Sequence, residues 1–177
     1  MTIKQKQCLL AYLGYYAGGL DGIWGKLSQG AEDAFRRDYG LSGEELTQAL
    51  LDALNGKLQR RDPWEAVRYF QKEEFVCRCG GKYCGGYPAQ VDATLLLVAD
   101  RVREHFGAPA ILTSGLRCVV HNKNVGGVTG SRHMSGKAMD FYIQGKGSAA
   151  VLEFVMEQPE IRYAYAIDDL CVHMDVV

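Results

Sequence analysis

One short segment, SRHMSGKAMDFYI at residues 131–143, restricts the possible folds of this chain more than any other. Its two metal-ligand residue types, His133 and Asp140, are seven positions apart, a spacing that would separate them by ~10 Å on a single helix. Gly136 lies between them and favours a turn, so a histidine from a loop and an aspartate from a strand can converge. His173 lies on the last predicted strand, which can pair with the Asp140 strand in a sheet.

Two histidines and one carboxylate provide three nitrogen and oxygen ligands and leave a fourth position open, as in catalytic zinc sites. Such a position would hold a water molecule whose pKa is lowered towards neutrality. Spacing alone does not exclude the more frequent case, in which a loop histidine is simply a surface residue.

The periodicity of the apolar residues predicts an α+β fold, and the charged stretch with Asp62-Pro63 predicts a boundary between a first domain at residues 1–60 and a second domain. The first domain is expected to be a small module of three helices. The second is expected to be a mostly antiparallel sheet covered by helices. The predicted helices are 3–16, 28–40, 42–56, 90–106 and 147–158, and the predicted strands are 110–114, 137–143 and a C-terminal hairpin around Asp168-Asp169.

Local signals suggest where several of these elements begin. Ser28 is the predicted N-cap of the second helix, and Ser42 with Glu45 has the spacing of a capping box for the third. Pro63 suits the first turn of a short connecting helix. Residues 115–136 show no periodicity and are predicted to form a long loop, which in a compact domain is usually functional or disordered.

Composition excludes several classes of protein. Hydrophobic residues make up 47% of the chain, which argues against wholesale disorder. The net charge of −1 argues against a non-specific grip on nucleic acid or on anionic membranes. No apolar run approaches the ~20 residues of a membrane span. The N-terminal apolar stretch is interrupted by Gly14 and lacks a clean cleavage site, so we expect no export signal and synthesis in the cytoplasm.

Several motifs of the second domain resemble the zinc D-Ala-D-Ala peptidase family, which includes vancomycin-resistance dipeptidases, cell-wall carboxypeptidases and many phage endolysins. The matching positions are Ser131-x-His133-x-x-Gly136-x-Ala138-x-Asp140, followed by a late strand with His173. The stretch SGLRCVVHNKNVGG is also similar, although Leu116 stands where the family usually has an aromatic residue. The ending VHMDV fits a subgroup that ends in His-x-Asp. The resemblance covers residues 73–177.

The resemblance implies Zn²⁺ as cofactor and assigns roles to individual residues. The implied zinc ligands are His133, Asp140 and His173. Arg117 would stabilise the scissile carbonyl or the developing oxyanion, the alternative being a structural salt bridge. Ser131 would orient the loop or hydrogen-bond the substrate, unless it is only a turn residue. His121, in the same loop, is expected to touch substrate.

The general base is where this chain departs from its relatives. Several of them have glutamate three residues before the last histidine ligand, where this chain has Leu170, and others have histidine two residues before it, where this chain has Cys171. Asp169 is the predicted base, although it lies ~13 Å from His173 along an extended strand unless the hairpin curls over the site. Asp175, on the same strand face as His173, is either another candidate base or an acceptor for the N–H of a ligand histidine, and we favour the acceptor role.

The segment LLAYLGYYAGGLDGIWGKLSQGAEDAFRRDYGL resembles the peptidoglycan-binding domain of cell-wall hydrolases, except that Arg36 stands where glutamine is usual. Exposed Tyr15, Tyr16 or Trp24 could stack on sugar rings. The alternative is that these aromatic residues form the core of the three-helix unit, and for Trp24 we favour the core.

Four of the six cysteines lie within the region that resembles the zinc peptidase family, at Cys77, Cys79, Cys84 and Cys118. Free buried thiols, a disulfide formed after release from the cell and a structural zinc site are three alternatives that remain open. The C-x-C spacing differs from the usual C-x-x-C of a zinc knuckle, so the pattern favours none of them strongly.

Together these features predict a monomeric zinc peptidase that hydrolyses stem or cross-link peptides of bacterial peptidoglycan. We expect an endolysin that reaches the wall during phage lysis, without insertion into the membrane. The alternatives are a D,D-carboxypeptidase that trims terminal D-Ala and a wall-binding protein whose zinc is structural. The bond cleaved and the host are not encoded in any motif.

Overall fold

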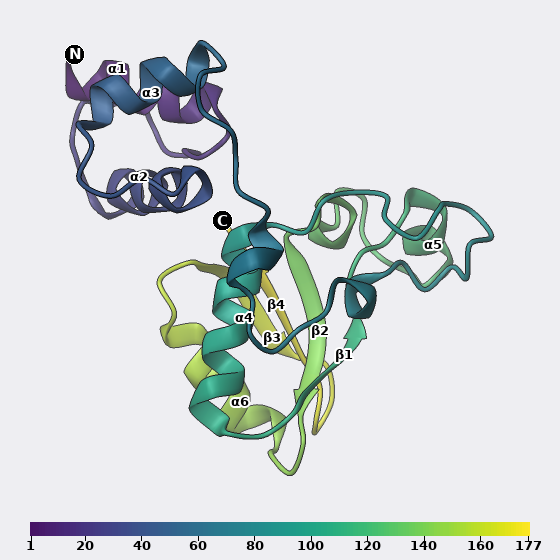
Figure 1. Ribbon diagram of the computed structural model, residues 1–177. Coiled ribbons are helices and arrows are strands. Elements are labelled where there is room, and N and C mark those ends of the chain that lie inside the picture. Colours follow the sequence, from purple (N-terminus) through teal and green to yellow (C-terminus); the bar gives the residue numbers. More distant parts are fainter. The chain divides into compact units, whose positions relative to one another are not determined.

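The computed structural model describes all 177 residues, which divide into two compact units, Met1–Glu65 and Ala66–Val177 (Figure 1). None of its helices combines the length and the apolar character needed to cross a membrane. The predicted α+β class is confirmed, because one unit is helical and the other combines helices with an antiparallel sheet.

The first unit consists of α1 (Ile3–Tyr12), α2 (Lys26–Tyr39) and α3 (Leu46–Leu54). Their apolar faces meet in one core, made of Leu10, Ala31, Phe35, Leu46, Ala49 and Leu50. Two predicted caps are wrong. Helix α2 begins after Gly25, and α3 begins after Glu45, whose side chain accepts a hydrogen bond from the Gln48 N–H.

Ser28 does not cap α2 because its side chain faces the interior and contacts the buried amide of Gln7. The Gln7 Nε2 lies 3.1 Å from Ser28 Oγ and 2.9 Å from Asp21 Oδ1, while the Gln7 Oε1 accepts the Gly22 N–H at 3.0 Å. This amide therefore ties the glycine-rich connection between α1 and α2 to the first helix. Long-range hydrogen bonding has replaced the local cap that the sequence predicts.

The aromatic residues of this connection are engaged within the unit. Tyr15, Tyr16 and Trp24 are partly buried and pack against the apolar core. The Tyr15 hydroxyl donates to Asp38 at 2.9 Å, and the Trp24 indole donates to Gln29 at 3.1 Å. These contacts favour a role of the three aromatic residues in the core over exposed rings that stack on sugars.

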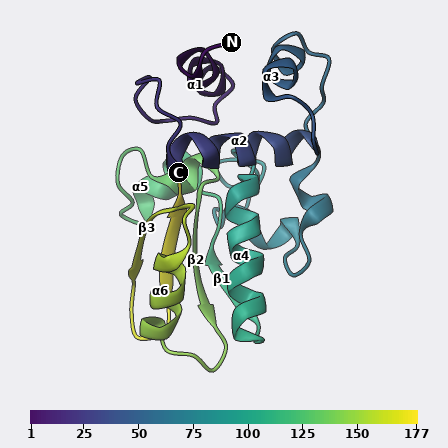
Figure 2. The same ribbon diagram turned by 90° about the vertical axis from the view of Figure 1, so that its left-hand side faces the viewer.

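The second unit is built on a four-stranded antiparallel sheet in the order β1-β2-β4-β3. Its strands are β1 (Ala110–Ser114), β2 (Ala138–Ile143), β3 (Ile161–Ala166) and β4 (Val172–Val176). Helices α4 (Ala93–Phe106) and α6 (Ser148–Glu157) contact the sheet and one another, so both cover the same face (Figures 1 and 2). The shorter elements are η1 (Pro63–Ala66), η2 (Lys72–Phe75), α5 (Val119–Asn124) and η3 (Arg132–Ser135).

Side chains alternate between the two faces of the central strands. The apolar set that is buried on one face consists of Met139, Phe141, Ile143, Val172, Met174 and Val176. The residues between them, Asp140, His173 and Asp175, are polar and also buried. Because successive strand residues point to opposite faces, these polar residues share the face opposite the apolar set. The alternation leaves one sheet face apolar and gives the other the potential ligands.

Two sequence predictions for this unit are wrong in detail. Residues 115–136 are not one irregular loop, since they contain α5 and η3. The C-terminal hairpin turns through five residues, 167–171, rather than through Asp168 and Asp169 alone. Asp168 accounts for the longer turn, because its carboxylate accepts the N–H groups of Leu170 and Cys171 at 2.8 and 2.7 Å.

Candidate metal centre

Strand pairing brings the first two candidate ligands together. Asp140 on β2 lies directly opposite His173 on β4, and the His173 Nδ1 is 2.6 Å from Asp140 Oδ1. His133, in η3, places its Nε2 3.1 Å from the same oxygen. The three residues are 7%, 8% and 2% exposed, respectively. A pair of strands and one tight turn thus gather three potential ligand atoms in a buried position.

The turn after His133 requires glycine. Gly136 ends η3 with φ +73°, a left-handed conformation that costs an L-residue ~1–2 kcal/mol. A Cβ atom at this position would lie 2.0 Å from the Gln90 carbonyl oxygen, far inside van der Waals contact. The chain therefore reverses between His133 and Asp140 against a closely packed backbone.

Two backbone contacts then fix the orientation of His133. Its Nδ1 donates to the Gly115 carbonyl at 2.7 Å, and its own carbonyl accepts the Arg117 N–H at 3.1 Å. Because a carbonyl can only accept, the neutral imidazole carries its proton on Nδ1 and a lone pair on Nε2. That lone pair faces the Asp140 carboxylate, so a cation between the two acceptors, either a proton or a metal ion, is required. The donor set fits zinc, which takes nitrogen and oxygen ligands.

Asp175 and Arg162 support His173 from behind. The His173 Nε2 lies 3.6 Å from Asp175 Oδ2, on the nitrogen that does not face Asp140. Both Asp175 oxygens accept hydrogen bonds from Arg162, from Nε and Nη2 at 2.7 Å each. A carboxylate in this place favours the tautomer in which Nδ1 is free to bind a metal.

The electrostatic surroundings keep Asp140 ionised. Burial by itself raises the pKa of this carboxyl, but its close contacts with His133 and His173 and the charge of Arg117 hold the pKa well below its usual range. Arg117 donates from Nη2 to the second Asp140 oxygen and from Nε to Ser114 Oγ, the latter at 2.8 Å. An anionic oxygen ligand is therefore present without a bound metal.

The sequence profile of the Peptidase M15 family matches residues 68–175. The chain belongs to the Peptidase M15 family. It is also 27% identical over 162 residues to the zinc D-Ala-D-Ala carboxypeptidase of Streptomyces albus G, a match that covers 86% of this chain and 62% of that protein. An alignment of that length extends into the first unit, and the chain spans 62% of the length of this relative.

Three other predicted site residues of this M15 domain lie outside the contacts of the centre. Ser131 immediately precedes η3 and makes no side-chain capping bond. His121 lies in α5, where its N–H points to the sulfur of Cys118 at 3.4 Å. Asp169 is exposed in the β3–β4 loop, and its carbonyl accepts the Ser148 N–H. Their proposed roles in substrate binding and proton transfer remain predictions.

One residue beside the M15 centre was missed at the sequence level. Tyr165 pairs with His173 across β3 and β4, its ring lies 4.9 Å from the imidazole, and it is 43% exposed. Burial and the nearby Asp140 carboxylate raise the pKa of its phenol. The alternation of IRYAYA puts both tyrosines of β3 on one face, but only the pairing register shows that this face is the one with His173.

Proposed function

We propose that the protein is a zinc-dependent peptidase that hydrolyses peptide bonds of bacterial peptidoglycan. The observation that carries the proposal is the buried cluster of His133, Asp140 and His173, whose facing lone pairs require a cation. Membership of the M15 family and the name of the Streptomyces relative support both the metal and the substrate class. When bound, zinc supplies Lewis-acid polarisation of a carbonyl and activation of water.

Arg117 is proposed to stabilise negative charge that develops on the substrate carbonyl. Its guanidinium has five N–H donors, and the contacts with Ser114 and Asp140 leave others free. Hydrogen bonds from Nε and from Nη2 hold the guanidinium in place, so it needs no reorganisation during the reaction. Arg117→Lys would keep the charge and lose the planar fork. We expect this variant to lower kcat by about 10²-fold while zinc remains bound.

Asp169 is proposed to be the general base that transfers the proton during hydrolysis. Asp175 is unsuited to this role because Arg162 occupies both of its oxygens, whereas Asp169 is exposed in the neighbouring loop. We expect Asp169→Asn to lower turnover at least ~100-fold without loss of zinc, as for removal of a general base. Asp168→Asn is the matched control, since asparagine retains an oxygen for the turn. Equal turnover in the two variants would exclude Asp169 from the mechanism.

We further propose that the protein acts as an endopeptidase of the endolysin type, with the first unit as a wall-binding module that delivers it during phage lysis. The resemblance of residues 3–56 to peptidoglycan-binding domains motivates this. The main alternative is a D,D-carboxypeptidase, which the name of the Streptomyces relative favours. These two activities differ in their products, because one releases cross-link or stem peptides and the other releases free D-Ala.

The deciding experiment measures turbidity loss of purified cell walls together with the masses of the released fragments. It compares the wild type, the wild type with a chelator, and His133→Ala. His105→Gln is the matched control, because His105 stacks on Phe154 and takes no part in the centre. We expect clearing by the wild type and His105→Gln only. Release of free D-Ala without clearing would show a carboxypeptidase and exclude the proposed endopeptidase. Wall binding without any released product would refute the proposal that the protein is an enzyme.

A further inference from the structure

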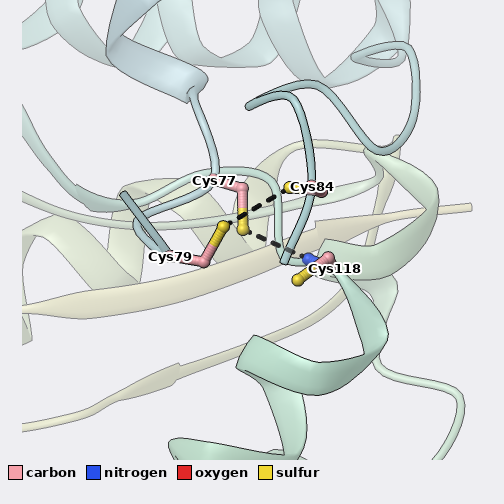
Figure 3. Close-up of side chains that lie close together, drawn as sticks. All are labelled: Cys77, Cys79, Cys84 and Cys118. Atoms are coloured by element: carbon pink, nitrogen blue, oxygen red, sulfur yellow. Dashed lines mark hydrogen bonds between the residues drawn. The ribbon is translucent and has the colours of Figure 1, made fainter. Parts of the chain in front are cut away.

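A second cluster of potential ligands lies apart from the His133 centre. It consists of Cys77, Cys79, Cys84 and Cys118, and Figure 3 shows their side chains converging on one point. Three of them belong to the turn-rich stretch that follows η2, and the fourth is the N-cap of α5. Tertiary structure thus joins residues that are up to 41 positions apart in the sequence.

The spacing of the sulfur atoms is that of a metal site. All four Sγ atoms lie within 4.8 Å of one another, and those of Cys79 and Cys84 are 3.5 Å apart. A tetrahedral zinc with Zn–S bonds of ~2.3 Å places its sulfurs ~3.8 Å apart. Sulfurs joined in a disulfide are only ~2.05 Å apart, and all six cysteines are free thiols.

Burial and hydrogen bonding also fit a metal-bound thiolate cluster. Cys77 is 2% exposed and Cys118 is 7% exposed. The Cys118 N–H donates to the sulfur of Cys77 at 3.3 Å (Figure 3). The His121 N–H donates to the sulfur of Cys118 at 3.4 Å. Backbone N–H groups directed at sulfur stabilise the charge that a thiolate ligand carries. No acidic or histidine side chain belongs to this cluster.

We propose that Cys77, Cys79, Cys84 and Cys118 bind a structural zinc ion. Four thiolates select zinc or iron among the common metals, and four protein ligands fill a tetrahedral zinc site. Because no position is left open for water or substrate, this second ion has no catalytic role. Its four ligands are separate from those of the His133 centre, and their assignment does not rest on the proposed peptidase activity.

The location of the cluster suggests what the ion stabilises. The stretch from Cys77 to Cys84 contains no helix or strand, so few backbone hydrogen bonds hold it in place. Zinc would fasten this stretch to Cys118, the residue that follows Arg117. The neighbouring Leu116 N–H already donates to the Phe75 carbonyl at 2.8 Å. The ion therefore positions the segment from which Arg117 reaches Asp140.

The zinc content of variants that lack one of the two sites distinguishes the contributions of the two sites. The test uses the full chain with His133→Ala and His173→Ala, in which the first centre lacks two ligands. We expect one zinc per chain after dialysis, a single sulfur shell at ~2.3 Å by X-ray absorption, and thiolate-to-metal charge transfer after replacement by Co²⁺. Adding Cys79→Ser and Cys84→Ser should reduce zinc to zero. Cys8→Ser with Cys171→Ser is the matched control and should leave it at one.

Thiol counting in the wild type tests the same proposal without any variant. We expect at most two reactive thiols, those of Cys8 and Cys171, in the native protein and six after zinc is extracted by a chelator. No zinc in the His133→Ala, His173→Ala chain would overturn the proposal, as would two disulfides in the protein isolated from the cytoplasm. Iron in place of zinc would overturn the identity of the metal.

Discussion

Replacing Gly136 by alanine tests how the chain brings His133 to Asp140. Two costs are expected. A left-handed backbone costs an L-residue ~1–2 kcal/mol. The new Cβ would also lie 2.0 Å from the Gln90 carbonyl oxygen, where real Cβ atoms stay at least 3.0 Å away, so one backbone segment must shift by about 1 Å.

The close approach adds to the conformational cost. Overpacking of this kind typically costs 1–3 kcal/mol, so the free energy of unfolding of the second unit should fall by about 2–5 kcal/mol in all. The Gly136 carbonyl also accepts the Asp92 N–H at 2.9 Å, so a shift disturbs the start of α4. Because His133 moves relative to Asp140, we expect zinc affinity to fall by about 10–100-fold, as when the supports of ligands are removed.

Gly145→Ala is the matched control. Gly145 has φ +75°, almost the same as the +73° of Gly136, but a Cβ there would meet nothing within 4 Å. This variant should lose only ~1–2 kcal/mol and keep its zinc affinity. The difference between the two variants, about 1–3 kcal/mol, isolates the steric contact with Gln90.

The assay must report on the second unit alone. The chain has two tryptophans, Trp24 and Trp64, and both belong to the first unit, so fluorescence does not serve. Amide hydrogen exchange of peptides from β2 and β4 measures the opening free energy of the sheet directly. Zinc affinity is measured by competition with a chelating dye. Equal losses of stability in Gly136→Ala and Gly145→Ala, with equal zinc affinity, would refute the reasoning.

Two further predictions concern buried polar contacts. Burial and the Asp38 carboxylate raise the pKa of Tyr15, so ionisation favours the unfolded chain, and the first unit should lose stability as pH rises through ~10. Tyr15→Phe should show a smaller loss between pH ~8 and ~11 in urea unfolding followed by tryptophan fluorescence, and an unchanged slope would contradict this. Arg162→Ala leaves the buried Asp175 unpaired and should cost about 1–3 kcal/mol by hydrogen exchange in β4, whereas full exchange protection would show that this pair is unimportant.

Local patterns in the sequence determined most of the elements. Helix α4 follows from its apolar stripe and from Gly107, which ends it in the left-handed conformation. Strands β1 and β2 and the C-terminal hairpin lie where alternation predicts them. The candidate triad was named by the resemblance to the zinc D-Ala-D-Ala peptidase family, because the spacing of His133, Asp140 and His173 alone does not exclude a simple surface histidine.

Local reasoning failed at two places where a side-chain hydrogen bond was not foreseen. Ser28 has the features of a helix cap, yet its hydroxyl contacts Gln7, 21 positions away. The hairpin turn is longer than its two aspartates suggest, because Asp168 binds two backbone N–H groups of the turn. The first contact is long-range, whereas the second is local to the turn.

Only the tertiary structure decided how the two clusters of potential ligands are assembled. The sequence names His133, Asp140 and His173, but the register of β2 against β4 sets Asp140 opposite His173, and the Gly115 carbonyl selects which nitrogen of His133 faces the carboxylate. Likewise, Cys118 meets the other three cysteines only through the tertiary fold of the second unit. Periodicity and glycine conformation are properties of neighbouring residues, whereas register and the convergence of distant loops depend on packing of the whole domain.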